Sequence, residues 1–163
     1  WHIQKQEVSV MYRKVLVPLD GSELAECVLP HVKDLVKENF TGEVILVNVF
    51  YPYFPLPEEK DLFTYGDYKA TKERIRQSSI KYLDHLQSKL ASEGIAVKTE
   101  MLTGSRPAET IAEYAQDNGI DLIIISTHGY TGLKKMMFGS VALEVLHSSR
   151  IPVLLVRPES CRE

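Results

Sequence analysis

Apolar residues along the chain follow two alternating patterns, one typical of buried strands and one typical of amphipathic helices. Short runs rich in Val, Ile and Leu, each ending near proline, glycine or a polar turn residue, predict five strands: Lys14–Leu19, Glu43–Val49, Ile95–Leu102, Asp121–Ile125 and Ile151–Val156. Between them, apolar residues three and four positions apart predict helices: one over Ala25–Val36, capped by Ser22, one over Tyr68–Ser92, ended by Gly94, one from Pro107 to Asn118, and one from near Ser140.

This order of strands and helices is typical of an α/β domain with a doubly wound, open parallel sheet that helices cover on both faces. The run Asp121–Ile125 is the most apolar, so we expect it at the centre of the sheet. Polar and apolar residues alternate in Ile95–Leu102, which favours a half-exposed or edge strand. Several prolines within Phe50–Asp67 predict a long irregular connection there.

Length and composition restrict the class of protein. The chain has 163 residues, which suits one domain; we expect it to span residues 11–158, with a leader or tag at 1–10 and a tail at 159–163. A net charge of −3 argues against nucleic acid as a partner. No apolar run approaches the roughly 18 residues of a membrane span. Cys27 and Cys161 are too few for a disulfide framework, which favours thiols in a reducing cytoplasm.

Residues that follow the strands are candidates for chemistry, because ligands of an open parallel sheet bind outside the carboxyl ends of its strands. Three of these places are short: Asp20 to Ser22, Val49 to Phe50, and Gly104 to Ser105. At the first, Asp20 is positioned to accept from hydroxyl or amino groups of a ligand, or else only makes the turn before Gly21.

The segment from Ser126 to Ser140, after the fourth predicted strand, is the most informative. Gly129 and Gly132 allow close approach of the backbone to a ligand, and Gly139 and Ser140 open a helix whose first amides suit a phosphate. The alternative is that the glycines only make tight turns and Ser140 only caps the helix. His128 lacks a recognisable nucleophile and orienting partner, so no catalytic residue is predicted.

Taken together, these segments resemble the universal stress protein family, in its nucleotide-binding form. That family carries a glycine, two residues, a glycine, nine residues, and a glycine followed by serine or threonine. Here Gly129, Gly139 and Ser140 match, whereas Ser126 stands in place of the first glycine. The segments Val15–Ser22, Gly104–Ala108 and Pro152–Val156 also resemble the first strand and turn, the third-strand exit and the last strand of that family.

The resemblance implies a sheet of order 3-2-1-4-5 with ATP over the carboxyl ends of its strands, accompanied by Mg²⁺ or Mn²⁺ at the phosphates. Pro18 and Asp20 would border the adenosine, and Val49 would contact adenine through its backbone. The residues implied to wrap the ribose and phosphates are Ser126, Thr127, His128, Gly129, Tyr130, Thr131 and Gly132. Those implied at the helix start are Gly139, Ser140, Val141 and Ala142.

Several interpretations of the site and of its function remain open at this point. The Ser126 side chain can crowd the ribose, or its hydroxyl can hydrogen-bond to it. The implied function is an ATP-binding module of the stress response that forms a homodimer through Pro152–Val156. The alternatives are a slow ATPase that uses the same pocket and a dimeric scaffold that binds no nucleotide. The sequence also leaves open whether ATP, AMP or cyclic AMP is preferred.

Overall fold

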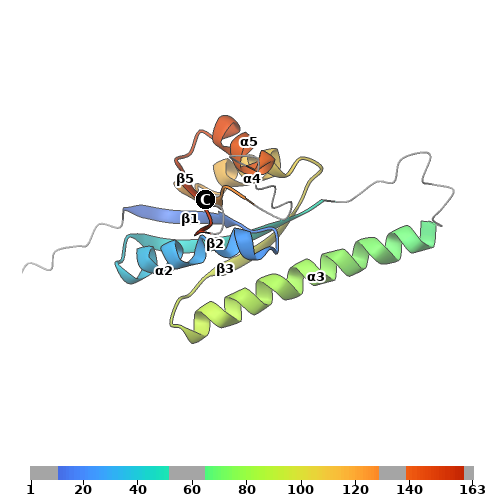
Figure 1. Cartoon of the computed structure of the whole chain (residues 1–163), viewed down its shortest axis with the longest axis horizontal. Helices are drawn as coiled ribbons and strands as arrows, with labels where there is room; N and C mark the ends of the chain where they lie inside the picture. Colours follow the sequence, from blue (N-terminus) through green and yellow to red (C-terminus); the bar gives the residue numbers. More distant parts are fainter. Residues whose placement is uncertain (1–10, 52–64, 129–138, 160–163) are drawn as a thin grey trace, which may run out of the picture.

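The strands and helices alternate along the chain (Figure 1) in a computed structural model that describes residues 11–51, 65–128 and 139–159. The elements are β1 (Tyr12–Pro18), α1 (Glu23–Glu26), α2 (Leu29–Lys37), β2 (Thr41–Phe50), α3 (Tyr65–Ser92), β3 (Lys98–Thr103), α4 (Pro107–Asp117), β4 (Leu122–Ser126), α5 (Ser140–Ser148) and β5 (Val153–Val156).

The strands form one parallel sheet of order β3-β2-β1-β4-β5, so the predicted doubly wound fold is confirmed. The chain enters the sheet at β1, builds outwards to β3, and then returns to the other side of β1 to add β4 and β5. The strand order therefore reverses between β1 and β4. The expectation that β4 is central is wrong: β4 is an interior strand, and β1 is in the middle. The expectation that β3 is an edge strand is confirmed.

Apolar side chains of the strands point alternately to the two faces and form two separate clusters. Val15, Val17 and Leu46 belong to the cluster covered by α1, α2 and α3. Leu16 and Ile123 belong to the other, covered by α4 and α5. In Figure 1, α4 and α5 lie above the sheet, and α2 and α3 lie below it. Burial on both sides explains why the interior strands are almost continuously apolar.

Two helical boundaries differ from the sequence-based expectation. The helix expected over Ala25–Val36 is two helices, because Pro30 occupies the first turn of α2 and starts a new helix there. Helix α3 begins at Tyr65 rather than Tyr68, inside the stretch expected to be irregular. No proline follows Pro57 before this helix, so nothing in the backbone prevents the earlier start. At the other end of that stretch, Phe50 is the last residue of β2, and residues 52–64 lie outside the described residues.

Pro18 ends the backbone hydrogen-bond pairing between β1 and β4. The amide of Leu19 donates to the carbonyl of Val47 in β2 (2.8 Å), so the preceding residue, Pro18, directs its nitrogen towards β4. Proline has no N–H to donate there. The β1–β4 register accordingly ends at Leu16 and Ile123, whereas β1 and β2 stay paired as far as Pro18. The two strands thus separate at their carboxyl ends.

Helix α3 is long but strongly polar. Its residues 69–78 are exposed, and Figure 1 shows this part of the helix extending beyond the sheet. Among the helices of the described residues, none is long and apolar enough to cross a membrane.

The central core predicts a large cost for cavity formation at Leu46. This side chain is 0% exposed, so Leu46→Ala should lower the free energy of unfolding by about 3 kcal/mol, through lost burial and an unfilled cavity. The matched control is Leu143→Ala, because Leu143 is 39% exposed and should lose less than about 1 kcal/mol. Urea unfolding measures both changes, and equal losses would contradict the described core.

A second prediction concerns acid stability. The Lys98 ammonium lies 2.7 Å from the Glu43 carboxylate and holds the pKa of Glu43 below its usual value. A lowered folded-state pKa stabilises the protein above the unfolded pKa of glutamate, about 4.3, and this contribution is lost as pH falls through the folded-state value. Because the pair is largely solvated, Glu43→Gln should cost less than about 1 kcal/mol at neutral pH. Urea unfolding across pH should show this difference vanishing in acid; a pH-independent difference would contradict it.

Candidate functional site

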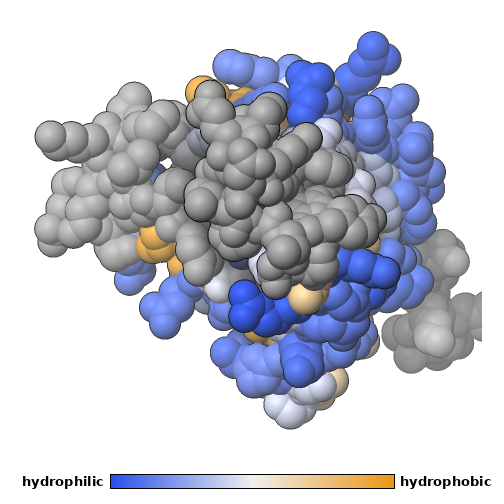
Figure 2. All heavy atoms as spheres, turned by 90° about the vertical axis from the view of Figure 1, so that its right-hand side faces the viewer, coloured by the Kyte–Doolittle hydropathy of each residue, from blue (hydrophilic) through white to orange (hydrophobic). Residues whose placement is uncertain are grey.

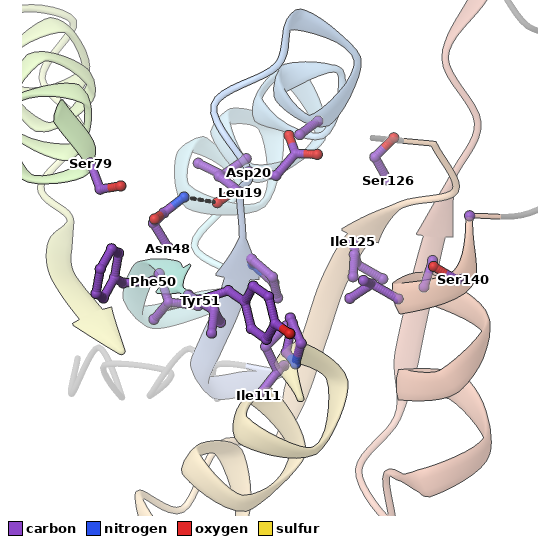
Figure 3. Close-up of a pocket in the computed structure, with 18 of the residues that line it drawn as sticks. Leu19, Asp20, Asn48, Phe50, Tyr51, Ser79, Ile111, Ile125, Ser126 and Ser140 are labelled. Atoms are coloured by element: carbon purple, nitrogen blue, oxygen red, sulfur yellow. Dashed lines mark hydrogen bonds between the residues drawn. The ribbon is translucent and has the colours of Figure 1, made fainter. Parts of the chain in front are cut away.

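A cleft of about 450 Å³ lies at the carboxyl ends of the strands, where β1 and β4 separate (Figure 3). Its position is the one that open parallel sheets use for ligands, the crevice at the reversal of strand order. Figure 2 views this end of the molecule, and hydrophilic side chains predominate among the described residues seen there. The volume falls within the range of about 300–1,000 Å³ that is usual for small-molecule sites.

The cleft reaches both faces of the sheet. On one side it is lined by apolar residues beside α4 and α5: Val47, Val49, Ile111, Ile125, Val141 and Ala142. On the side of α1 and α3 it is lined by Leu19, Ala25, Asn48, Phe50, Ile75 and Ser79. Polar groups are few, and most come from the strand ends and from the start of α5. An apolar pocket with a few placed polar groups is typical of a binding site.

Asp20 makes the turn after β1 and also lines the cleft. Its Oδ1 accepts from the backbone N–H of Ser22 (3.0 Å) and from the Ser22 hydroxyl (2.6 Å). Gly21 between them has a φ of 89°, which glycine adopts without strain. The Ser22 hydroxyl accepts in turn from the N–H of Ala25 and caps α1. Asp20 therefore makes the predicted turn and also lines the cleft, where the interpretation as a ligand acceptor requires it to be.

Negative charge near this turn affects the pKa of Tyr82 in α3. Burial is the largest cause that raises the pKa of the Tyr82 phenol well above its usual range, and the charges of Glu26 and Asp20 raise it further. The phenol stays protonated throughout the physiological pH range. No change of its charge is therefore available to alter this side of the site.

Ser126 ends β4, and its hydroxyl folds back onto the chain. The Oγ atom accepts from the backbone N–H of His128 (3.2 Å), an arrangement that a serine uses to stabilise a turn. The thiol of Cys27 donates to the same oxygen at 3.5 Å. The side chain that replaces the glycine of the family pattern is therefore buried and engaged in its own turn.

Thr127 and His128 continue this turn and are both buried. The Thr127 hydroxyl and Nδ1 of His128 share a hydrogen bond of 2.9 Å. His128 lines the cleft, whereas Thr127 does not; the Thr127 carbonyl accepts from the N–H of Gly139 at 2.5 Å. This bond joins the end of β4 to the start of α5.

The start of α5 forms one wall of the cleft. A side-chain Cβ at Gly139 would meet the Thr127 carbonyl oxygen at 3.2 Å, so glycine permits this close approach. Gly139 precedes the helix in an extended conformation. Within the described residues, no carbonyl accepts from the amides of Ser140, Val141 or Ala142. Amides at a helix N-terminus, together with its partial positive charge, form a binding place for an anion.

The structure brings together many of the residues that the sequence singled out. The cleft is lined by Pro18, Asp20, Val49, Ser126, His128, Gly139, Ser140, Val141 and Ala142. Thr127 is buried and does not line it, and neither do Gly104 and Ser105 after β3. Four further predicted residues, Gly129, Tyr130, Thr131 and Gly132, lie outside the described residues.

Sequence reasoning missed the cleft residues on the α3 side of the sheet. The sequence contains a signal that could have indicated Asn48, because it is the one polar residue in the apolar run Val44–Val49. Ser79 had none, since a serine in a polar helix is unremarkable in the sequence. Ile75 of α3 and Ile111 of α4 were recognisable only as apolar positions of their helices. Their place at the cleft depends on tertiary packing.

No group of three or more His, Cys, Asp or Glu side chains within the described residues is arranged to hold a metal ion. Asp20 is the one carboxylate among the described residues that line the cleft. A cation at this site would therefore depend on a bound ligand for most of its oxygen ligands.

Comparison with known proteins gives consistent results. The profile of the universal stress protein family matches residues 11–157. Universal stress protein MJ0577 of Methanocaldococcus jannaschii is 34% identical over 162 residues, which cover 92% of this chain and 98% of that protein. Universal stress protein MJ0531 of the same organism is 32% identical over 149 residues, covering 90% and 83%.

Solved structures share the fold. The structure of MJ0577 superposes with a TM-score of 0.77 over 92% of this chain and 99% of that one. An Arabidopsis thaliana protein of the family, solved with AMP bound, gives a TM-score of 0.63 at 16% identity, over 93% of this chain and 99% of that one. At that identity the likeness concerns the fold alone. On the match over nearly its whole length and on its close relatives, the chain belongs to the universal stress protein family.

Proposed function

We propose that the cleft binds an adenine nucleotide, ATP in the first instance, with its phosphates at the start of α5. The observation that carries this proposal is the set of amides at Ser140, Val141 and Ala142, which no described carbonyl accepts and which border the cleft. Gly139 supports it, because a side chain there would meet the backbone of the neighbouring turn. Gly129 to Gly132, which the family resemblance assigns to the ribose and phosphates, lie outside the described residues.

The nucleoside would occupy the apolar part of the cleft. Pro18 and Asp20 border its middle, where β1 and β4 separate, and Val49 lies at the end of β2. In this proposal Val49 contacts adenine through its backbone, and the turn of Ser126 and His128 faces the ribose. AMP and cyclic AMP carry the same base and ribose as ATP, so the proposed site would accept them as well.

Magnesium or manganese would accompany the phosphates. Mg²⁺ keeps several waters and is usually held by one or two carboxylates together with phosphate oxygens. The proposal therefore needs no cluster of protein ligands, and the phosphates themselves would supply most of the coordination.

Binding, rather than hydrolysis, is the function that the site supports best. A general base must lie within hydrogen-bond reach of the attacking water. Among described cleft residues the one carboxylate, Asp20, bonds to Ser22 and lies at the nucleoside end of the proposed site. We therefore infer a nucleotide-dependent module of the stress response, acting in the cytoplasm, in which bound nucleotide alters conformation or partner choice.

Substitution of Ser140 tests the phosphate site. Ser140→Asp adds a carboxylate at the first position of α5, where negative charge suits the helix and the fold should be kept. The same charge would repel phosphates, so ATP affinity should fall at least about tenfold, AMP affinity less, and adenosine affinity hardly at all. Isothermal titration with each compound in the presence of Mg²⁺ measures the series.

The matched control for this test is Ser140→Asn, which has nearly the same shape as the aspartate and no charge. It should bind ATP within about threefold of the wild type. Equal losses in both variants, or ATP binding by Ser140→Asp at wild-type affinity, would contradict phosphate binding at α5. Absence of ATP binding by the wild-type protein would overturn the proposed function itself.

We further propose that β5 pairs with its copy in a homodimer. β5 is the outer strand of the sheet and offers an unpaired edge among the described residues. Leu154 of this strand is 41% exposed, so an apolar side chain is available for contact at this edge. Pairing of two such edges about a two-fold axis would satisfy both backbones and bury both leucines.

Leu154→Lys tests the dimer. A lysine would place like charges close together across the two-fold axis, so the variant should be monomeric at concentrations where the wild type is dimeric. The control is Phe40→Lys, because Phe40 is 44% exposed but precedes β2, on the far side of the sheet from β5. Sedimentation equilibrium measures the mass; a dimer that survives Leu154→Lys, or a monomeric wild type, would refute pairing through β5.

A further inference from the structure

One buried side-chain polar atom among the described residues has no hydrogen-bond partner, the hydroxyl oxygen of Tyr82 in α3. The Tyr82 side chain packs against the core cluster that α1, α2 and α3 cover. A buried polar group without a partner is costly, and nearly all such groups in native proteins are satisfied. This hydroxyl therefore favours any other arrangement of the protein in which it can donate a hydrogen bond.

An acceptor for this hydroxyl is close by, at the end of α1. Burial is the largest cause of the raised pKa of the Tyr82 phenol, and the charge of Glu26 is the next. The Glu26 carboxylate is therefore near the phenol, although no hydrogen bond satisfies the hydroxyl in the described arrangement. The charge of Asp20 also raises this pKa, but its Oδ1 already accepts from the amide and hydroxyl of Ser22. Glu26 is thus the better placed acceptor of the two.

Helix α1 connects the cleft with this phenol. Ala25 of α1 is buried and lines the cleft, and the next residue is Glu26, whose charge affects Tyr82. Asp20 lines the cleft as well and bonds to Ser22, which caps α1. A ligand that contacts Asp20 or Ala25 therefore acts on the same short element that carries Glu26.

The bonds at the end of α1 are weak. Helix α1 has a single turn, Glu23–Glu26, and so short a helix has little stability of its own. The thiol of Cys27, which follows it, donates to the Ser126 hydroxyl oxygen at 3.5 Å and to the Val156 carbonyl at 3.9 Å. A thiol is a weak donor, whereas a bond from a phenol to a carboxylate is charge-assisted and roughly twice as strong as a neutral one. A small displacement of this end would therefore exchange weak contacts for a stronger one.

We propose that Tyr82 is a positioning residue for nucleotide binding: when a nucleotide occupies the cleft, the end of α1 moves towards α3, and Glu26 accepts a hydrogen bond from the Tyr82 hydroxyl. This inference rests on the proposed nucleotide function and identifies the element that responds to the ligand. A ligand shifts such an equilibrium only through its different affinity for the two arrangements. Because the new bond exists only in the bound protein, it raises nucleotide affinity and leaves the stability of the free protein unchanged.

Tyr82→Phe separates the free protein from the bound one. Removal of an unsatisfied hydroxyl should leave the thermal midpoint of the free protein unchanged or raise it. The same change should lower ATP affinity about tenfold, measured by isothermal titration with Mg²⁺, because the bond to Glu26 is lost. The matched control is Tyr114→Phe, since Tyr114 is a partly buried tyrosine of α4 that does not line the cleft. This control should bind ATP within about twofold of the wild type.

A double-mutant cycle identifies Glu26 as the acceptor. Glu26→Ala should lose about tenfold in ATP affinity, and Glu26→Gln only about threefold, because its amide oxygen still accepts without the charge. Tyr82→Phe added to Glu26→Ala should cost no further affinity, since both changes remove the same bond. A merely structural role of Tyr82 would instead lower the thermal midpoint of the free protein and give additive losses.

The remaining outcomes separate this inference from the proposed function. ATP binding by Tyr82→Phe at wild-type affinity, additive losses in the cycle, or a lowered thermal midpoint of free Tyr82→Phe overturns the inference and leaves the proposed nucleotide site intact. Failure of the wild-type protein to bind ATP overturns the proposed function, and this inference with it.

Discussion

The missing amide hydrogen of Pro18 is the constraint on which the rest of the site depends. In a fully paired parallel sheet the next donor from β1 to β4 would come from this residue, and proline cannot supply it. The strands on both sides stay paired with their other neighbours, β1 with β2 and β4 with β5, so the sheet opens only between them. Reversal of strand order alone gives a crevice at this place, and the backbone pairing of β1 with β4 ends before it.

Because of this opening, a single cleft reaches both faces of the sheet, which are otherwise separate. Side chains above the sheet pack in one cluster and those below in another, and the interior strands lie between them. Only beyond the last paired residues can a single ligand touch α5 on one side and α3 on the other. The polar groups divide along the same line: amides that no described carbonyl accepts lie at the start of α5, and the Asn48 side chain lies on the α3 side of the sheet. The bond from Asn48 to Leu19 ties this second side to the turn that carries Asp20.

The sequence predicted most of the fold and about half of the candidate site. Apolar runs and their terminating residues suffice for five strands in a parallel sheet, because burial on both faces leaves a continuous pattern. They did not reveal the break at Pro30, since apolar spacing continues across it, or the start of α3 at Tyr65. Residues that directly follow strands were found because topology places strand ends together. Ser79 and Ile75 were not, because their place depends on how α3 lies across the sheet.

Ser126 shows how a departure from a family pattern is best interpreted through its own hydrogen bonds. A glycine at the end of β4 would leave the His128 amide without the acceptor that the serine hydroxyl provides. In this chain the Ser126 hydroxyl stabilises the turn by accepting from the His128 amide. The thiol of Cys27, at the end of α1, donates to the same hydroxyl oxygen. The side chain is thus directed into the protein's own contacts, and a hydroxyl so engaged is held in one place before any ligand arrives. The serine therefore replaces the conformational freedom of glycine with a turn that its own hydroxyl stabilises.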